Sequence, residues 1–152
     1  MKYIIITLIT VLAFSGCSKN NAFDSFKLTK EQELSINSLQ SSKIKSVKDT
    51  DGIFSAIYLN DIYPKLFNHN EYFFVFYYMK SHNIDVKFRL NGDETIKIKK
   101  LPSNNRFTNL IDIQNNWNNY YLVSFNKQKK KTLNLLLENG LYSSDLLKYQ
   151  KD

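Results

Sequence analysis

Few residues of this chain have side chains suited to catalysis or metal binding. It has one cysteine, Cys17, and two histidines, His69 and His82. Neither histidine stands at metal-ligand spacing from another histidine, a cysteine or a carboxylate, and the chain has no Gly-rich phosphate loop, nucleophile elbow or zinc-protease motif. We therefore expect a protein that is not an enzyme, with no catalytic residues, no metal and no cofactor. A catalytic site assembled from carboxylates far apart in the sequence is the less favoured alternative.

Cys17 follows an apolar run near the start of the chain. Lys2 precedes the run YIIITLITVLAF, and the small residues Ser15 and Gly16 come just before the cysteine. A positive start, a short apolar core and a small-residue exit are typical of a secretory signal peptide. The run is about 12 residues long, whereas a transmembrane helix needs about 20. The sequence therefore predicts that residues 1–16 are a signal peptide.

The tetrapeptide FSGC, from Phe14 to Cys17, resembles the lipobox of bacterial lipoprotein precursors, which usually has Leu where this chain has Phe14. The resemblance implies that Cys17 receives a diacylglycerol thioether, that the chain is cut before it and that the new N-terminus is acylated. Several acyl chains are enough for stable membrane anchoring. By resemblance to enteric lipoproteins, Ser18 in place of an Asp favours the outer membrane of a Gram-negative bacterium. The alternative is an ordinary signal peptide followed by a free or buried cysteine.

The one tryptophan, Trp117, lies in the Asn-rich stretch IQNNWNNYY. An amphipathic aromatic side chain among amide donors and acceptors can anchor a glycan or a protein partner. We therefore predict a binding site that includes Trp117, Asn116 and Asn118. The alternative is a tryptophan that folds back to plug one end of the domain, and the two interpretations predict different stabilities for a Trp117→Ala variant.

A run of lysines, NKQKKK, lies between two predicted strands and contains Lys127, Lys129, Lys130 and Lys131. A solvated turn is the ordinary interpretation of such a run. Contact with anionic lipid head groups or lipopolysaccharide phosphates is the alternative. On that basis Lys129, Lys130 and Lys131 are also candidate binding residues.

The chain is basic, with a formal net charge of +7 and a pI of about 9.4. Such a balance can indicate a nucleic-acid or anionic-membrane partner. The chain is also rich in Asn, Ile, Tyr, Phe and Lys, a joint enrichment typical of AT-rich genomes, so the charge carries little weight. The secretory signal disfavours nucleic acid as a partner.

Residues 18–50 are polar, with much Ser, Lys and Asn and few bulky side chains. This composition predicts that residues 17–50 form a lipidated N-terminus and a flexible tether. Thr29 and Gln32 match a capping box, which favours a short helix across KEQELSINSLQ, although the apolar stripe of that helix is thin.

Beyond residue 51 the sequence changes to short apolar runs broken by turn residues. A run that is apolar or aromatic at every position, residues 72–79, is expected to be a central strand, buried on one face by the core and covered in part on the other. About seven strands in about 100 residues, without a helical pattern between them, are the signature of an antiparallel, Ig-like β-sandwich, which we predict as one domain over residues 51–152. The seven predicted strands are 53–60, 72–79, 84–90, 94–100, 120–126, 132–138 and one within 142–150.

The dipeptide Asn91-Gly92 predicts a hairpin. Its usual form is a two-residue type I′ turn, which would set Val86 opposite Lys97. A three-residue loop with Gly92 in a G1 bulge sets Val86 opposite Ile96 instead. We predict the second register, because it keeps apolar side chains on one face.

These features fit three functions. We favour a membrane-anchored envelope lipoprotein whose domain is a non-enzymatic binding or adhesion module for a protein or glycan partner. The first alternative is a structural or assembly accessory of an envelope complex, bound through an edge strand or an apolar patch. The second, less favoured, is an envelope hydrolase without a recognisable motif. A fold alone does not decide among them.

Overall fold

The computed structural model describes residues 27–80 and 85–151. The signal peptide and Cys17 lie outside these residues. The helical elements are α2 (Lys30–Ser38), α3 (Leu59–Ile62) and the 3-10 helix η2 (Thr108–Leu110). The strands are β1 (Gln40–Lys45), β2 (Thr50–Tyr58), β3 (Glu71–Met79), β4 (Lys87–Leu90), β5 (Asp93–Glu94), β6 (Lys97–Leu101), β7 (Asn119–Phe125), β8 (Thr132–Asn139), β9 (Tyr142–Ser144) and β10 (Leu147–Gln150).

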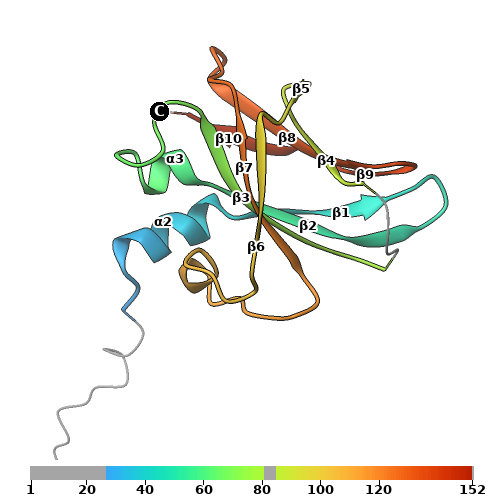
Figure 1. The fold of residues 1–152 in the computed structure, drawn as a ribbon, viewed down its shortest axis with the longest axis horizontal. Coiled ribbons are helices and arrows are strands. Elements are labelled where there is room, and N and C mark those ends of the chain that lie inside the picture. The colour runs from blue at the N-terminus through green and yellow to red at the C-terminus, as the bar shows by residue number, and fades with distance from the viewer. Residues whose placement is uncertain (1–26, 81–84, 152) are drawn as a thin grey trace, which may run out of the picture.

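The strands form one antiparallel sheet in the order β5-β4-β8-β9-β1-β2-β3-β7-β6, and β10 also pairs with β8. The sheet curls, so that β4 and β8 lie over β2 and β3 (Figure 1). The prediction of a mainly β, antiparallel domain is confirmed. The expected seven-strand, two-sheet sandwich is corrected to a single curled sheet of ten strands. The two halves are continuous because β9 pairs with β8 on one side and with β1 on the other.

The predicted helix is confirmed as α2. Its capping box is complete, because Gln32 N donates to Thr29 Oγ1 and Thr29 N donates to Gln32 Oε1. Two backbone donors at the start of the helix are thereby satisfied.

Strand β1 lies within the segment that the composition assigned to a flexible tether. It pairs with β2 along its whole length and with β9 at its end, and it buries Ile44 completely. The predicted tether to residue 50, with a domain starting at residue 51, is therefore wrong for residues 30–45. The polar composition was misleading because β1 turns most of its side chains outward and buries a single large one.

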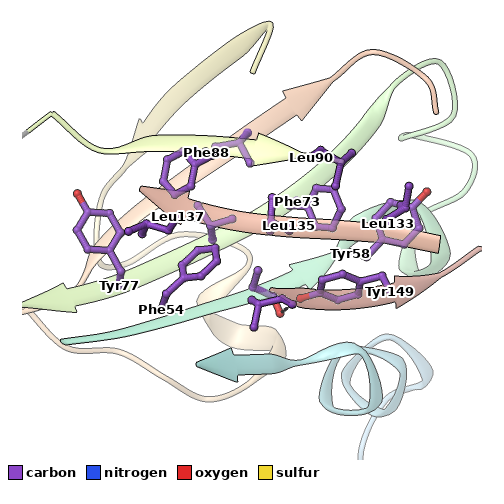
Figure 2. Close-up of a cluster of buried hydrophobic side chains, with 14 of the residues drawn as sticks. Phe54, Tyr58, Phe73, Tyr77, Phe88, Leu90, Leu133, Leu135, Leu137 and Tyr149 are labelled. Atoms are coloured by element: carbon purple, nitrogen blue, oxygen red, sulfur yellow. Dashed lines mark hydrogen bonds between the residues drawn. The ribbon is translucent and has the colours of Figure 1, made fainter. Parts of the chain in front are cut away.

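Two apolar clusters flank the central strand β3. Alternate residues along a strand point to opposite faces. Phe73, Val75, Tyr77 and Met79 point inward, where they meet side chains of β2, β4, β8 and β10 (Figure 2). Phe74 and Phe76 point to the outer face, which α2, α3 and η2 cover. Residues 72–79 are thus a central strand that is buried on its inner face and covered in part on its outer face, as predicted.

The Asn91-Gly92 hairpin has the register that we did not favour. Arg89 pairs with Glu94 and Leu90 with Asp93, which leaves a two-residue turn. Both turn residues have positive φ, 53° and 95°, as a type I′ turn requires. The hairpin is short because the chain then leaves β4 and pairs with β7 as β6. The long pairing that favoured the other register therefore never forms.

The burial of Ile44 gives a direct test of β1. Ile44→Ala should lower the free energy of unfolding by about 2–5 kcal/mol, because it removes a fully buried side chain from the inner cluster. Lys43→Ala, one residue earlier and exposed, is the matched control and should change it by less than about 0.5 kcal/mol. Urea denaturation measures both. Equal and small effects would mean that residues 40–45 do not belong to the folded domain.

Candidate functional site

Cross-strand pairing sets out the side chains on the outer face of the sheet in rows. One row runs from Lys43 of β1 through Ile53 of β2 to Tyr78 of β3. Ile53 and Tyr78 are 55% and 41% exposed, whereas Phe74, further along β3, is completely buried. The helices therefore cover one part of the outer face and leave an apolar strip uncovered.

A groove of about 580 Å³ lies over this strip. Its floor comes from β2 and β3, and its wall comes from the connection between β6 and β7. None of the lining residues is charged, in a chain with 35 charged side chains (21 basic and 14 acidic). The floor includes Ile53, Ser55, Phe76 and Tyr78, and the wall includes Ile113, Asn115, Trp117 and Asn118.

The base of the groove wall is held by hydrogen bonds, whereas its tip is exposed to solvent. Asn118 N donates to Asn115 Oδ1 at 2.9 Å, and the buried Tyr120 hydroxyl donates to the Asn115 carbonyl at 3.2 Å. Asn116 accepts a hydrogen bond from Ser103 at 3.1 Å. The Trp117 indole, in contrast, is 71% exposed. The loop is therefore held in place while it presents an aromatic side chain to solvent, and the end-plug interpretation of Trp117 is wrong.

Two of the three residues predicted in this loop, Trp117 and Asn118, line the groove, and Asn116 does not. The sequence analysis missed Ile53 and Tyr78. Both lie in predicted strands, but their adjacency depends on the β2–β3 register, and no short-range signal in the sequence gives that register.

The lysine run lies at the far end of β7 from the groove wall. Lys129, Lys130 and Lys131 are exposed, and Lys127 Nζ donates to the Asn68 carbonyl at 3.3 Å. Seven residues of β7 separate the two connections, a length of about 20 Å. The structure therefore does not bring the two sets of candidate binding residues together.

A buried carboxylate holds the lysine-bearing connection in place. Glu71 is completely buried at the start of β3. Its Oε1 accepts from Gln128 N and from Lys151 Nζ, both at 2.9 Å, and its Oε2 accepts from the Tyr58 hydroxyl at 2.6 Å. Burial alone raises the pKa of Glu71, but these three hydrogen bonds and the Lys151 charge outweigh it, so the pKa lies below its ordinary value.

Among the described residues, no three or more His, Cys, Asp or Glu side chains are grouped so that they could hold a metal ion. His69 is exposed on the connection before β3, and His82 lies outside the described residues. Within residues 27–80 and 85–151, no helix has the length and apolar character needed to cross a membrane.

No protein-family model, no curated protein and no solved structure matches this chain.

The Glu71 cluster predicts a pH dependence. Glu71→Gln should lower the free energy of unfolding by about 3 kcal/mol at neutral pH, because Lys151 loses its buried counter-charge. The folded-state pKa of Glu71 is depressed, so the stabilisation is present above the ordinary value of 4.5 and is lost as the pH falls through the folded value. The difference in Tm between wild type and variant should therefore stay constant from pH 7 down to about pH 4.5 and shrink as the pH falls further.

Glu138→Gln is the control for this measurement. Glu138 pairs with Arg89 on the partly exposed surface, at 2.6 Å, and should contribute less than about 1 kcal/mol. A Tm difference for Glu71→Gln that stays constant over the whole pH range would contradict the assignment of a charged, buried Glu71.

Proposed function

We propose that this chain is a lipid-anchored protein of a bacterial cell envelope and that its β domain is a non-enzymatic binding module. The signal-peptide pattern of residues 1–16 and the lipobox-like FSGC support lipid attachment at Cys17. Ser18 supports the outer membrane of a Gram-negative bacterium as the location. The membrane is then reached through the N-terminal lipid, and no nucleic acid or cofactor is involved.

The observation that carries the binding proposal is the groove beside Trp117. A soluble surface rarely exposes a large contiguous apolar patch, and such patches mark interaction sites. Here an exposed indole stands over an uncovered apolar strip of the sheet. The lining has no charge and few polar groups, so it fits an apolar, uncharged partner surface. Trp117 and Asn118 are its proposed binding residues, and Asn116 supports the loop from behind.

The exposed lysines Lys129, Lys130 and Lys131 are proposed as a second, separate surface for anionic groups. They lie at the other end of β7 from the groove. The two surfaces therefore do not form one continuous site.

A structural or assembly accessory of an envelope complex is the second candidate function. The groove supports it as well, because it is the kind of apolar patch that such a role needs. Edge pairing supports it less: β6 ends the sheet and exposes Lys97, Lys99 and Lys100, and lysines on an edge strand oppose pairing with another chain. An envelope hydrolase is a weaker candidate, since the residues that line the groove include no carboxylate, histidine or cysteine that could act as an acid, a base or a nucleophile.

The Cys17→Ala variant tests whether the chain carries a lipid. Cys17→Ala should release the protein from the membrane fraction, or leave the longer precursor unprocessed, because the variant has no thiolate to take a lipid. Fractionation of cells, detergent-phase partition and gel mobility measure this. Ser18→Ala keeps the thiol and should behave as the wild type. A Cys17→Ala protein with unchanged mobility in a detergent-extractable membrane fraction would rule out the lipobox interpretation.

The Trp117→Ala variant tests binding through the groove. Trp117→Ala should leave the Tm nearly unchanged, because the side chain is mostly exposed, and should weaken attachment of the purified protein to envelope preparations by about 30-fold, the effect of losing a 2 kcal/mol anchor. Leu141→Ala removes another exposed apolar side chain, 90% exposed in the β8–β9 turn, and should leave attachment unchanged. Equal losses in the two variants would argue against a specific site at the groove.

A further inference from the structure

We infer that the apolar partner surface of the groove is the lipid–water interface of the membrane that anchors the chain. This inference rests on the proposed function, because it requires lipid attachment at Cys17. Four observations support it: the length of the connection to the lipid, the place where the chain enters the domain, the side chains around the groove and the engagement of two of its polar atoms within the fold.

The connection between the lipid and the domain is short. Thr29, the N-cap of α2, is twelve residues after Cys17. Twelve residues reach at most about 40 Å when fully extended. A domain of this size is about 35 Å across, taken as 2.6 times a radius of gyration of about 14 Å. The domain therefore stays within contact range of the bilayer.

The chain enters the domain on the same face of the sheet as the groove. Gln32, in the first turn of α2, donates to the Asn109 carbonyl at 3.3 Å, and Asn109 accepts from Gln114 at 3.1 Å. Gln114 is the residue just before the groove wall at Asn115. In Figure 1, α2 and the connection between β6 and β7 both lie below the strands. The described part of the chain therefore begins on the groove side of the domain.

The side chains around the groove are those that proteins place at a lipid interface. Trp117 and Tyr78 are exposed amphipathic aromatics, which favour the boundary between head groups and acyl chains. Ile53, which lines the same groove, adds an exposed aliphatic group. Lys43 follows Ile53 on the same cross-strand row and is exposed, in a position to meet anionic head groups.

Two of the polar atoms in the groove are already engaged within the fold. Ser55 Oγ shares a hydrogen bond with Ser41 Oγ at 2.7 Å, and Asn115 Oδ1 accepts from the backbone of its own loop. A sugar hydroxyl that met either atom would compete with the existing hydrogen bond. An acyl chain does not compete for these hydrogen bonds.

The contact with the bilayer need not be strong. A short tether holds the groove at a high effective concentration near the lipid surface, so that a weak intrinsic affinity is enough for frequent contact. The lysine run is about 20 Å from the groove wall along β7 and remains accessible for a second partner.

Trp117 is the only tryptophan of the chain, so its fluorescence reports on the groove directly. The lipidated protein is reconstituted into vesicles of phosphatidylethanolamine and phosphatidylglycerol, with and without dibrominated lipid, and the Cys17→Ala protein in buffer gives the baseline. In vesicles, the emission should shift to shorter wavelength, brominated lipid should quench it, and quenching by acrylamide should fall several-fold. Ile53→Ser should weaken these changes, and Leu141→Ser should not.

Flotation of the same samples separates the two proposals. A protein that does not float with the vesicles lacks the anchor, which overturns the proposed function and this inference together. A protein that floats, with Trp117 as open to acrylamide as in buffer and unaffected by brominated lipid, overturns the inference alone. Shielding of Trp117 only after an envelope protein or glycan fraction is added also overturns it and assigns the groove to that partner.

Discussion

Strand β3 is apolar on both faces, and the rest of the structure follows from the need to cover it. Phe73, Val75, Tyr77 and Met79 are buried on one side of the strand, and Phe74 and Phe76 are buried on the other. Each large apolar side chain contributes about 1.5–3 kcal/mol when it leaves water, so neither face can stay open without a substantial loss of stability. A single flat sheet cannot cover both of its own faces. The chain meets the requirement by curling the sheet over one face and laying α2, α3 and η2 over the other.

The groove is the place where the outer cover ends. Phe74 lies under η2, whereas Tyr78, four residues further along the same face of β3, is partly open to solvent. The remaining strip is lined by the one connection that carries a tryptophan. The helices cover only part of this apolar face, so the described part of the chain leaves the rest of it open to solvent. The exposed Trp117 side chain enlarges this open apolar surface. A partner at this position would continue the layer that the helices begin.

Features that depend on short-range sequence patterns could be predicted, and features that depend on strand partners could not. The capping box of α2 and the all-apolar strand β3 are visible in single stretches of sequence, and both are confirmed. Strand β1 was missed because its place is set by β2 and β9, not by its own composition. The predicted hairpin register was wrong for the same reason, because β6 pairs with β7 and not with β4. For the site, the sequence pointed to Trp117, but its apolar neighbours Ile53 and Tyr78 meet only through the folded register.

Strand β7 connects the two candidate surfaces, the groove and the lysine run, and sets the distance between them. At one end, the Tyr120 hydroxyl holds the groove wall through the Asn115 carbonyl. At the other end, Glu71 holds the lysine-bearing connection through Gln128 N and holds the end of the chain through Lys151. The buried Glu71 carboxylate fixes the positions of its three partners, because its hydrogen bonds are kept only while each partner stays in place. The lysine run and the groove are therefore parts of one rigid body, and whatever surface the groove contacts also determines which way the lysines face.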